Sequence, residues 1–151
     1  MNKYVEYFKK VSIETSKLST CASKAVGAVL VKNNRILAIS YNGVVSKAEH
    51  CNKIFDAYEL YTKEYEREIH HKWSLNNEIH AEQNLISFCA KNGISTKNTE
   101  LYITLEPCIT CSKLITASGI TKVYFINYYD KSDNQIGLKF LKNNNILVEK
   151  I

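Results

Sequence analysis

The chain has 151 residues, 45% of them hydrophobic and 23% charged, which is an ordinary balance for a globular protein with one substantial core. No stretch is long and apolar enough to predict a membrane span. The formal net charge of +5 comes from scattered lysines, so we expect a solvated surface and no nucleic-acid groove. A mild positive field still suits a phosphorylated small substrate.

The five cysteines indicate whether the protein is expected in an oxidising or a reducing cellular compartment. The residues after Met1 do not lead into an apolar run with a small-residue cleavage site, so we expect no secretory signal and a cytoplasmic location. An odd number of cysteines without an export signal argues against a disulfide framework. Metal ligation and burial remain as explanations for them.

The first part of the chain predicts a helix and a hairpin. Residues 4–18 carry apolar side chains at roughly helical spacing. Two apolar runs, 26–31 and 36–41, predict strands. Asn33 and Asn34 between them suit a tight hairpin, because asparagine tolerates positive φ.

Residues 44–74 interrupt this regular pattern. They are polar, charged and rich in tyrosine, with a helical pattern over 54–69. We expect an insertion within a single domain that spans residues 1–151.

Helical and strand patterns then alternate to the end of the chain. Helices are predicted at 78–91, 108–118 and 135–141, and strands at 101–105, 123–126 and 146–149. Gly93 and Gly119 follow the first two helices, as glycine often does at helix C-termini. Such alternation predicts parallel strands with helices packed on the sheet, and therefore an α/β fold.

Four residues of this half form a candidate zinc site. His80, Cys108 and Cys111 offer one nitrogen and two sulfur ligands, and three protein ligands leave tetrahedral zinc one open position, as in catalytic sites. Glu82 is near enough in sequence to carry protons without being a ligand. The two cysteines fall on one face of a first helical turn, where the helix N-terminus favours thiolates.

Each of these residues alone has an ordinary explanation. His80 could be a surface or core histidine, and Glu82 a favourable charge in a first helical turn. Cys108 and Cys111 could be half of a structural zinc site, but such a site needs another closely spaced pair, and the sequence has none. Their joint placement favours the catalytic interpretation. Cys89 repeats the apolar stripe of its helix, so we expect core packing there.

The H-x-E and P-C-x-x-C pattern resembles that of zinc-dependent nucleobase deaminases. Further stretches make the chain similar to the deoxycytidylate (dCMP) deaminases, especially the phage-encoded type. They are residues 21–29, Tyr41-Asn42-Gly43, residues 73–82, residues 107–111 and Ser118-Gly119-Ile120 with Val123-Tyr124. This resemblance covers most of the chain. It implies a cytidine-deaminase-like three-layer α-β-α sandwich around a five-stranded mixed sheet.

The resemblance also implies an activity, the zinc-dependent hydrolysis of dCMP to dUMP and ammonia, which supplies dUMP for thymidylate synthesis. Zinc held by His80, Cys108 and Cys111 would provide hydroxide at neutral pH. Glu82 would carry the proton of the attacking water to the ring nitrogen and then protonate the departing amine. The family forms hexamers, so a homo-oligomer is expected, with a small nucleotide as partner and neither nucleic acid nor membrane.

Substrate contacts are implied at Asn42, Ala81 and Tyr129. By the resemblance, Asn42 would bind the sugar and Tyr129 would lie near the 5′-phosphate. Asn84, one helical turn behind the site, would orient the catalytic turn. Two of these residues keep ordinary alternatives, because Tyr129 could be a rim aromatic and Asn84 a solvated helix residue.

A second, structural zinc is implied as well. In phage-type relatives its ligands come from the hairpin start, the insertion and the stretch before the catalytic histidine. The matching positions here are Cys21, Cys51, His70 and Glu78, with His50 or His71 as substitutes for His70. The alternative is a pair of buried thiols with His70 and Glu78 on the surface.

One departure from the family concerns regulation. Relatives controlled by dCTP and dTTP carry glycine and proline in the loop after Tyr-Asn-Gly, where backbone approaches the effector. Here residues 44–49 contain neither, and glycine permits a close backbone approach that valine does not. We therefore expect a weak response to these triphosphates.

Two other functions remain as alternatives. Glu106, before Pro107, is more common in tRNA adenosine deaminases, but such enzymes usually show a basic face, which the mixed charges of residues 44–74 do not suggest. A non-catalytic zinc-binding scaffold would need the ligands but not Glu82.

Overall fold

The computed structural model describes residues 2–129 and 135–151, and its centre is a five-stranded mixed sheet. The strands run in the order β2-β1-β5-β6-β7. β1 is antiparallel to both β2 and β5, whereas β5, β6 and β7 are parallel, which confirms the predicted sheet. Their bounds are β1 Gly27–Lys32, β2 Arg35–Tyr41, β5 Thr99–Leu105, β6 Ile120–Asn127 and β7 Leu147–Lys150.

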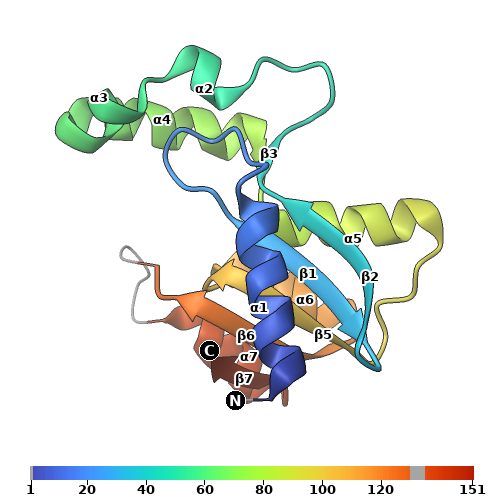
Figure 1. Cartoon of the computed structure of the whole chain (residues 1–151). Coiled ribbons are helices and arrows are strands. Elements are labelled where there is room, and N and C mark those ends of the chain that lie inside the picture. The colour runs from blue at the N-terminus through green and yellow to red at the C-terminus, as the bar shows by residue number, and fades with distance from the viewer. Residues whose placement is uncertain (1, 130–134) are drawn as a thin grey trace.

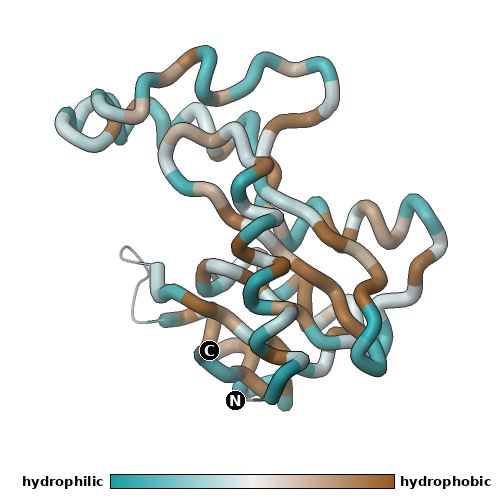
Figure 2. Tube along the Cα trace, viewed as in Figure 1, coloured by the Kyte–Doolittle hydropathy of each residue, from teal (hydrophilic) through white to brown (hydrophobic). Residues whose placement is uncertain are grey.

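Helices cover both faces of this sheet and complete the predicted three layers (Figure 1). α1 packs on one face, against alternate side chains such as Val29 and Val31 of β1. α5, α6 and α7 pack on the other face, against residues such as Leu30 and Ile103. The four helices are α1 Lys3–Ser16, α5 Ala81–Asn92, α6 Ile109–Ala117 and α7 Ile136–Asn143. Figure 2 shows apolar residues concentrated along the central strands, where the two cores meet the sheet.

The predicted hairpin is present. Asn33 and Asn34 join β1 to β2 with φ values of 50° and 59°, the left-handed conformations that a tight hairpin needs. The connection places the end of β2 beside the start of β1, with Tyr41 opposite Gly27. Tyr41 and Gly27 therefore lie at the same end of the sheet as the carboxyl ends of the parallel strands.

The insertion is helical, but the expected pattern over 54–69 is not one helix. It divides into α2 (Cys51–Ile54), α3 (Ala57–Thr62) and α4 (Glu64–Asn77). The chain breaks between them because Phe55, Asp56 and Lys63 adopt extended backbone conformations. In Figure 1 these helices lie away from the main sheet. A small separate cluster, with Cys51, Phe55 and Leu60 at its centre, holds them together.

The helix predicted to begin at residue 78 begins at Ala81 instead. The reason is a short ladder that the sequence did not suggest, in which β3 (Gly43–Val44) pairs antiparallel with β4 (Glu78–Ile79). These strands flank the helical segment α2 to α4. The ladder therefore brings the chain back to the sheet immediately before His80.

None of the helices in the described part of the chain has the length and apolar character that crossing a bilayer requires.

Candidate metal centre and active site

The candidate ligands lie at the N-termini of two neighbouring helices. His80 is the N-cap of α5 and Cys108 is the N-cap of α6, both with extended backbone, while Glu82 and Cys111 lie within the first turns. The His80 backbone N–H donates to Gln83 Oε1 at 2.9 Å, and the Cys111 N–H donates to Cys108 Sγ at 3.5 Å. Helix N-termini carry partial positive charge, so both positions stabilise thiolate and carboxylate groups.

The three ligand atoms form a cluster with the dimensions of a zinc site. His80 Nδ1 lies 3.7 Å from Cys108 Sγ and 3.4 Å from Cys111 Sγ, and all three atoms lie within 4.8 Å of one another. Tetrahedral zinc, with Zn–N and Zn–S bonds of about 2.1 and 2.3 Å, separates its ligand atoms by about 3.6–3.8 Å. The donor set therefore fits zinc, and Nδ1 is the histidine nitrogen that faces the ion's position.

The surroundings of the two sulfur atoms shift their pKa values in opposite directions. A hydrogen bond from Cys111, together with His80 and the Cys111 backbone N–H, lowers the pKa of Cys108 to about 4 against the opposing effect of burial. The neighbouring Cys108 sulfur and burial raise the pKa of Cys111. The pair thus favours a thiolate, the form in which cysteine binds a metal ion.

Glu82 is almost completely enclosed, with 4% of its surface exposed. Burial raises the pKa of its carboxyl to about 7, opposed by its own backbone N–H, by His80 and by a hydrogen bond with Cys111. The carboxyl therefore lies directly beside the ligand cluster. A group with a pKa near neutrality can both accept and release a proton at physiological pH.

The end of β2 holds the surrounding loops in place. Asn42 Oδ1 accepts from the Val26 N–H and Asn42 Nδ2 donates to the Lys24 carbonyl, each at 2.8 Å, so this amide fixes the segment before β1. Asn84 Nδ2 donates to the Tyr41 carbonyl at 2.8 Å and ties α5 to β2. Both predicted residues are therefore positioned around the site.

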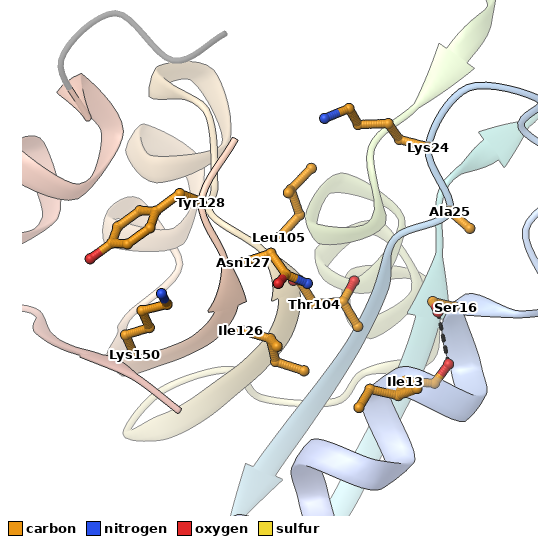
Figure 3. A pocket seen from close by; sticks show the side chains of 10 residues that line it. All are labelled: Ile13, Ser16, Lys24, Ala25, Thr104, Leu105, Ile126, Asn127, Tyr128 and Lys150. Carbon is orange, nitrogen blue, oxygen red and sulfur yellow. Dashed lines mark hydrogen bonds between the residues drawn. The ribbon is translucent and has the colours of Figure 1, made fainter. Parts of the chain in front are cut away.

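A cavity of about 790 Å³ opens at the carboxyl ends of β5 and β6, on the side of α1. Figure 3 shows Lys24 and Lys150 on opposite sides of it. Their ammonium groups lie 4.6 Å and 4.4 Å from the ring centroids of Tyr129 and Tyr128. Lys24 and Lys150 thus bring two positive charges to the lining of the cavity.

The second predicted cluster also comes together. Cys21 Sγ lies 3.8 Å from His70 Nε2 and 3.5 Å from Glu78 Oε2, and Cys51 Sγ lies 3.3 Å from His70 Nε2. The four ligand atoms are all within 4.8 Å of one another. Cys51 and His70 are buried, and Glu78 Oε1 is a buried oxygen without a hydrogen-bond partner. Four such donors fit a closed tetrahedral zinc site.

The two substitute histidines do not take part in that cluster. His50 Nδ1 lies 3.0 Å from Thr20 Oγ1, and His71 is not among the clustered donors. Of the three neighbouring histidines, the structure thus selects His70.

Three residues around the site were not predicted. Gln83 could have been found, because a glutamine three residues after an N-cap is a known capping signal. Ser40, whose hydroxyl donates to the Ala81 carbonyl at 2.6 Å, resembles any other strand residue in sequence. Gly137 permits α7 to approach residues 107–111, the turn that carries Cys108 and Cys111 (below, the metal turn). A Cβ at Gly137 would lie 2.2 Å from the Pro107 carbonyl oxygen.

The sandwich fold, with a three-ligand cluster and a buried glutamate at two helix N-termini, defines the class of zinc-dependent deaminases. Residues 2–127 match the family model described as the cytidine and deoxycytidylate deaminase zinc-binding region. The chain belongs to this family.

Individual relatives agree with that assignment. The deoxycytidylate deaminase of Enterobacteria phage T2 is 34% identical over 149 residues, covering 82% of this chain and 79% of the relative. The dCMP deaminase of cyanophage S-TIM5, solved in complex with dCMP and dUMP, is 31% identical with a TM-score of 0.78, covering 100% and 99% of the two chains. A tRNA:A34 deaminase structure, 22% identical with a TM-score of 0.57 over 95% and 99% of the chains, shares the fold alone.

Proposed function

We propose that the chain deaminates dCMP to dUMP and ammonia by hydrolysis. The observation that carries this proposal is the cluster of His80 Nδ1, Cys108 Sγ and Cys111 Sγ, with the buried Glu82 in the first turn of the helix that His80 caps. Membership of the family and likeness to a cyanophage enzyme solved with dCMP and dUMP support dCMP as the substrate.

The chain's own residues account for the proton transfers. Zinc held by His80, Cys108 and Cys111 would supply a Lewis acid that makes hydroxide available from water at neutral pH. Glu82 accepts the proton of the attacking water at its carboxylate and passes it to the ring nitrogen. It then takes the remaining proton from the hydroxyl group added to the ring carbon and delivers it to the exocyclic amine. The C–N bond breaks, ammonia leaves, and the added oxygen becomes the carbonyl of dUMP. The enclosure of Glu82 keeps bulk water away from its carboxyl during both transfers.

Three residues are proposed to contact the nucleotide. Tyr129 borders the region where Lys24 and Lys150 favour an anion, which supports a role near the 5′-phosphate. Asn42 already makes two hydrogen bonds, but an amide offers two N–H donors and two oxygen lone pairs, which leaves capacity for the sugar. Ala81 lies between His80 and Glu82, where its backbone is next to the base.

We also propose that the protein binds two zinc ions. Cys21, Cys51, His70 and Glu78 supply four donors, which would close a tetrahedral site and leave no open position for chemistry. The unpartnered Glu78 Oε1 supports this proposal, since a buried carboxylate oxygen without a hydrogen bond is costly unless a cation offsets its charge. This second ion would be structural.

The domain and assembly proposals follow from the family resemblance. One domain would span residues 1–151 with an insertion at about 44–74. The protein would assemble as a homo-oligomer, with a hexamer as the expected form.

One assay separates this function from the alternatives. Ammonia release is measured from dCMP, CMP, dCTP, deoxycytidine, adenosine nucleotides and a tRNA anticodon stem-loop, with zinc-loaded protein. We expect dCMP to give the highest kcat/KM. Preference for the stem-loop would favour the tRNA adenosine deaminase alternative, and no release from any substrate by protein with full zinc content would favour the scaffold.

A further inference from the structure

Ser40 of β2 makes a direct hydrogen bond to the first turn of α5. Its hydroxyl donates to the Ala81 backbone carbonyl at 2.6 Å, which is short for a hydrogen bond between two neutral oxygens. Both residues are buried, Ser40 with 8% and Ala81 with 0% of its surface exposed. A buried hydrogen bond of this kind is protected from exchange with water.

The position of this bond in the sequence is informative. Ala81 is the residue between His80, a candidate metal ligand, and Glu82, the candidate proton carrier. The bond from Gln83 to the His80 N–H lies within the same turn, so it shapes the turn but cannot fix where the turn lies. The bond from Ser40 comes from β2 and therefore fixes the turn relative to the sheet.

A second anchor follows one helical turn later. Asn84 donates to the carbonyl of Tyr41, the neighbour of Ser40, so two consecutive residues of β2 hold two residues on one face of α5. Asn84 is more exposed than Ser40 and lies farther from His80. Of the two bonds between β2 and α5, the Ser40 bond is thus the one closer in sequence to His80.

The metal cluster depends on this anchor because its ligands come from two helices. His80 begins α5, whereas Cys108 and Cys111 lie at the start of α6, which contacts α7 near Gly137. The distances from His80 Nδ1 to the two sulfurs are therefore set by how each helix is held. A shift of α5 along β2 would change those distances while leaving the cysteine pair intact.

We propose that Ser40 is a positioning residue for the reaction, an inference that rests on the proposed function. Its hydroxyl holds the first turn of α5 on β2 and so sets His80 Nδ1 and the Glu82 carboxyl in place against the two cysteine sulfurs. Groups that orient metal ligands typically affect metal affinity or activity by about 10–100-fold when they are removed.

The test compares Ser40→Ala with the wild type by two readouts. The first is the rate of zinc loss to a chelator, and a His80→Ala variant identifies the phase that belongs to the His80 cluster. The second is steady-state kinetics with dCMP. We expect Ser40→Ala to lose zinc in that phase about 10-fold faster and to lower kcat about 10-fold. We expect KM to change less than kcat, because the contacts proposed at Asn42 and Tyr129 stay in place and only the one at Ala81 can shift with the turn.

Two further variants separate positioning from general stability. Ser12 is also buried, and its hydroxyl donates to the Lys9 carbonyl at 2.7 Å, but it lies in α1 on the opposite face of the sheet. Ser12→Ala should lower the unfolding temperature to a similar extent without changing zinc loss or kcat. Ser40→Thr keeps the hydroxyl donor and should retain most of the zinc affinity and of kcat.

The outcomes distinguish this proposal from the proposed function. Equal zinc loss and equal kcat in Ser40→Ala and wild type would overturn the role of Ser40 while leaving dCMP deamination intact. Equal effects of Ser12→Ala and Ser40→Ala on both readouts would overturn it as well. If the wild type releases no ammonia from dCMP, the proposed function fails, and the zinc-loss rates still decide whether Ser40 positions the cluster.

Discussion

The two donor clusters of this protein differ in the number of their donors and in the elements that carry them. The first has three donors at the starts of α5 and α6, both packed on the main sheet. The second has four, from the loop before β1, from α2, from α4 and from β4. Three donors would leave a tetrahedral zinc ion one open position beside Glu82, whereas four donors would complete its coordination.

We expect the two clusters to serve different purposes, catalysis for the first and stability for the second. The first cluster lies on helices that already pack in the main apolar core. The second cluster joins segments that otherwise share a small apolar cluster with Cys51, Phe55 and Leu60 at its centre. Small assemblies of this kind often rely on a metal for stability. If both clusters hold zinc as proposed, loss of the first ion should remove activity, and loss of the second should chiefly remove stability.

The largest expected effect is that of Glu82→Gln, which tests whether the open cluster is catalytic. The amide cannot carry protons, whereas the three metal donors are unchanged. We expect kcat for dCMP to fall by at least about 10²–10⁴-fold, with metal content and unfolding temperature close to those of the wild type. Near-normal turnover by a fully metal-loaded Glu82→Gln protein would contradict the mechanism.

Cys51→Ser tests whether the closed cluster is structural. Metal analysis should fall from two zinc ions per chain to one, with part of the activity retained. If the lost site contributes about 2 kcal/mol or more, the unfolding temperature should drop by about 4–8 °C. Cys89→Ser is the matched control, because Cys89 is a buried thiol of α5 outside both clusters. One zinc ion per chain in the wild-type protein, purified without chelator, would rule out the second site.

Gly137→Ala tests whether the close packing of α7 against Pro107 supports the cluster of His80, Cys108 and Cys111. A methyl group there would overlap the Pro107 carbonyl oxygen and lie 2.8 Å from Ser112 Oγ, so α7 or the metal turn must move. Such crowding typically costs about 1–3 kcal/mol of unfolding free energy, measurable by urea denaturation. We expect kcat to fall as well. Gly43→Ala is the control, since its methyl group would meet no atom within 4 Å, and equal effects of the two substitutions would reject the explanation.

The smallest effect is expected from effector triphosphates. A hollow of about 380 Å³ lies beside residues 43–47, lined by Lys47 and by Val44 and Val45. The two β-branched valines restrict the backbone where a phosphate would approach. Initial rates against dCMP, with and without dCTP or dTTP and magnesium, should stay close to hyperbolic. A sigmoidal curve that dCTP makes hyperbolic would show that this loop binds effectors, and substrate would then have to tighten dCTP binding equally.

The sequence predicted the elements that depend on local patterns. The strand and helix alternation, the Asn33-Asn34 hairpin and the grouping of His80 with Cys108 and Cys111 were visible because spacing and turn chemistry report them directly. The ladder of β3 and β4 was not, since Gly43–Val44 and Glu78–Ile79 are too short to show a pattern. Their pairing depends on segments that are distant in sequence.

The residues that hold the site in place could not be predicted either, because their roles depend on contacts between segments distant in sequence. Ser40 follows an apolar strand residue and resembles any serine in a strand, and only its contact with the Ala81 carbonyl gives it a role. Gly137 resembles an unfavourable helix residue until the Pro107 carbonyl is placed against it. The residues that perform chemistry could be predicted from type and spacing, but those that hold them in place required the fold.

The ladder of β3 and β4 has a practical consequence for protein engineering. Because Val44 pairs with Glu78, the segment between them begins and ends at the same place, the two-stranded ladder of β3 and β4. Its tip, α3, carries the strongly exposed Tyr58 and Tyr61 and contributes no donor to either cluster. A reporter dye or an affinity handle could therefore be attached at position 58 or 61, with Leu60 left in its apolar cluster and the path of the chain at His80 unchanged, which makes this tip the natural place to attach the enzyme to a surface.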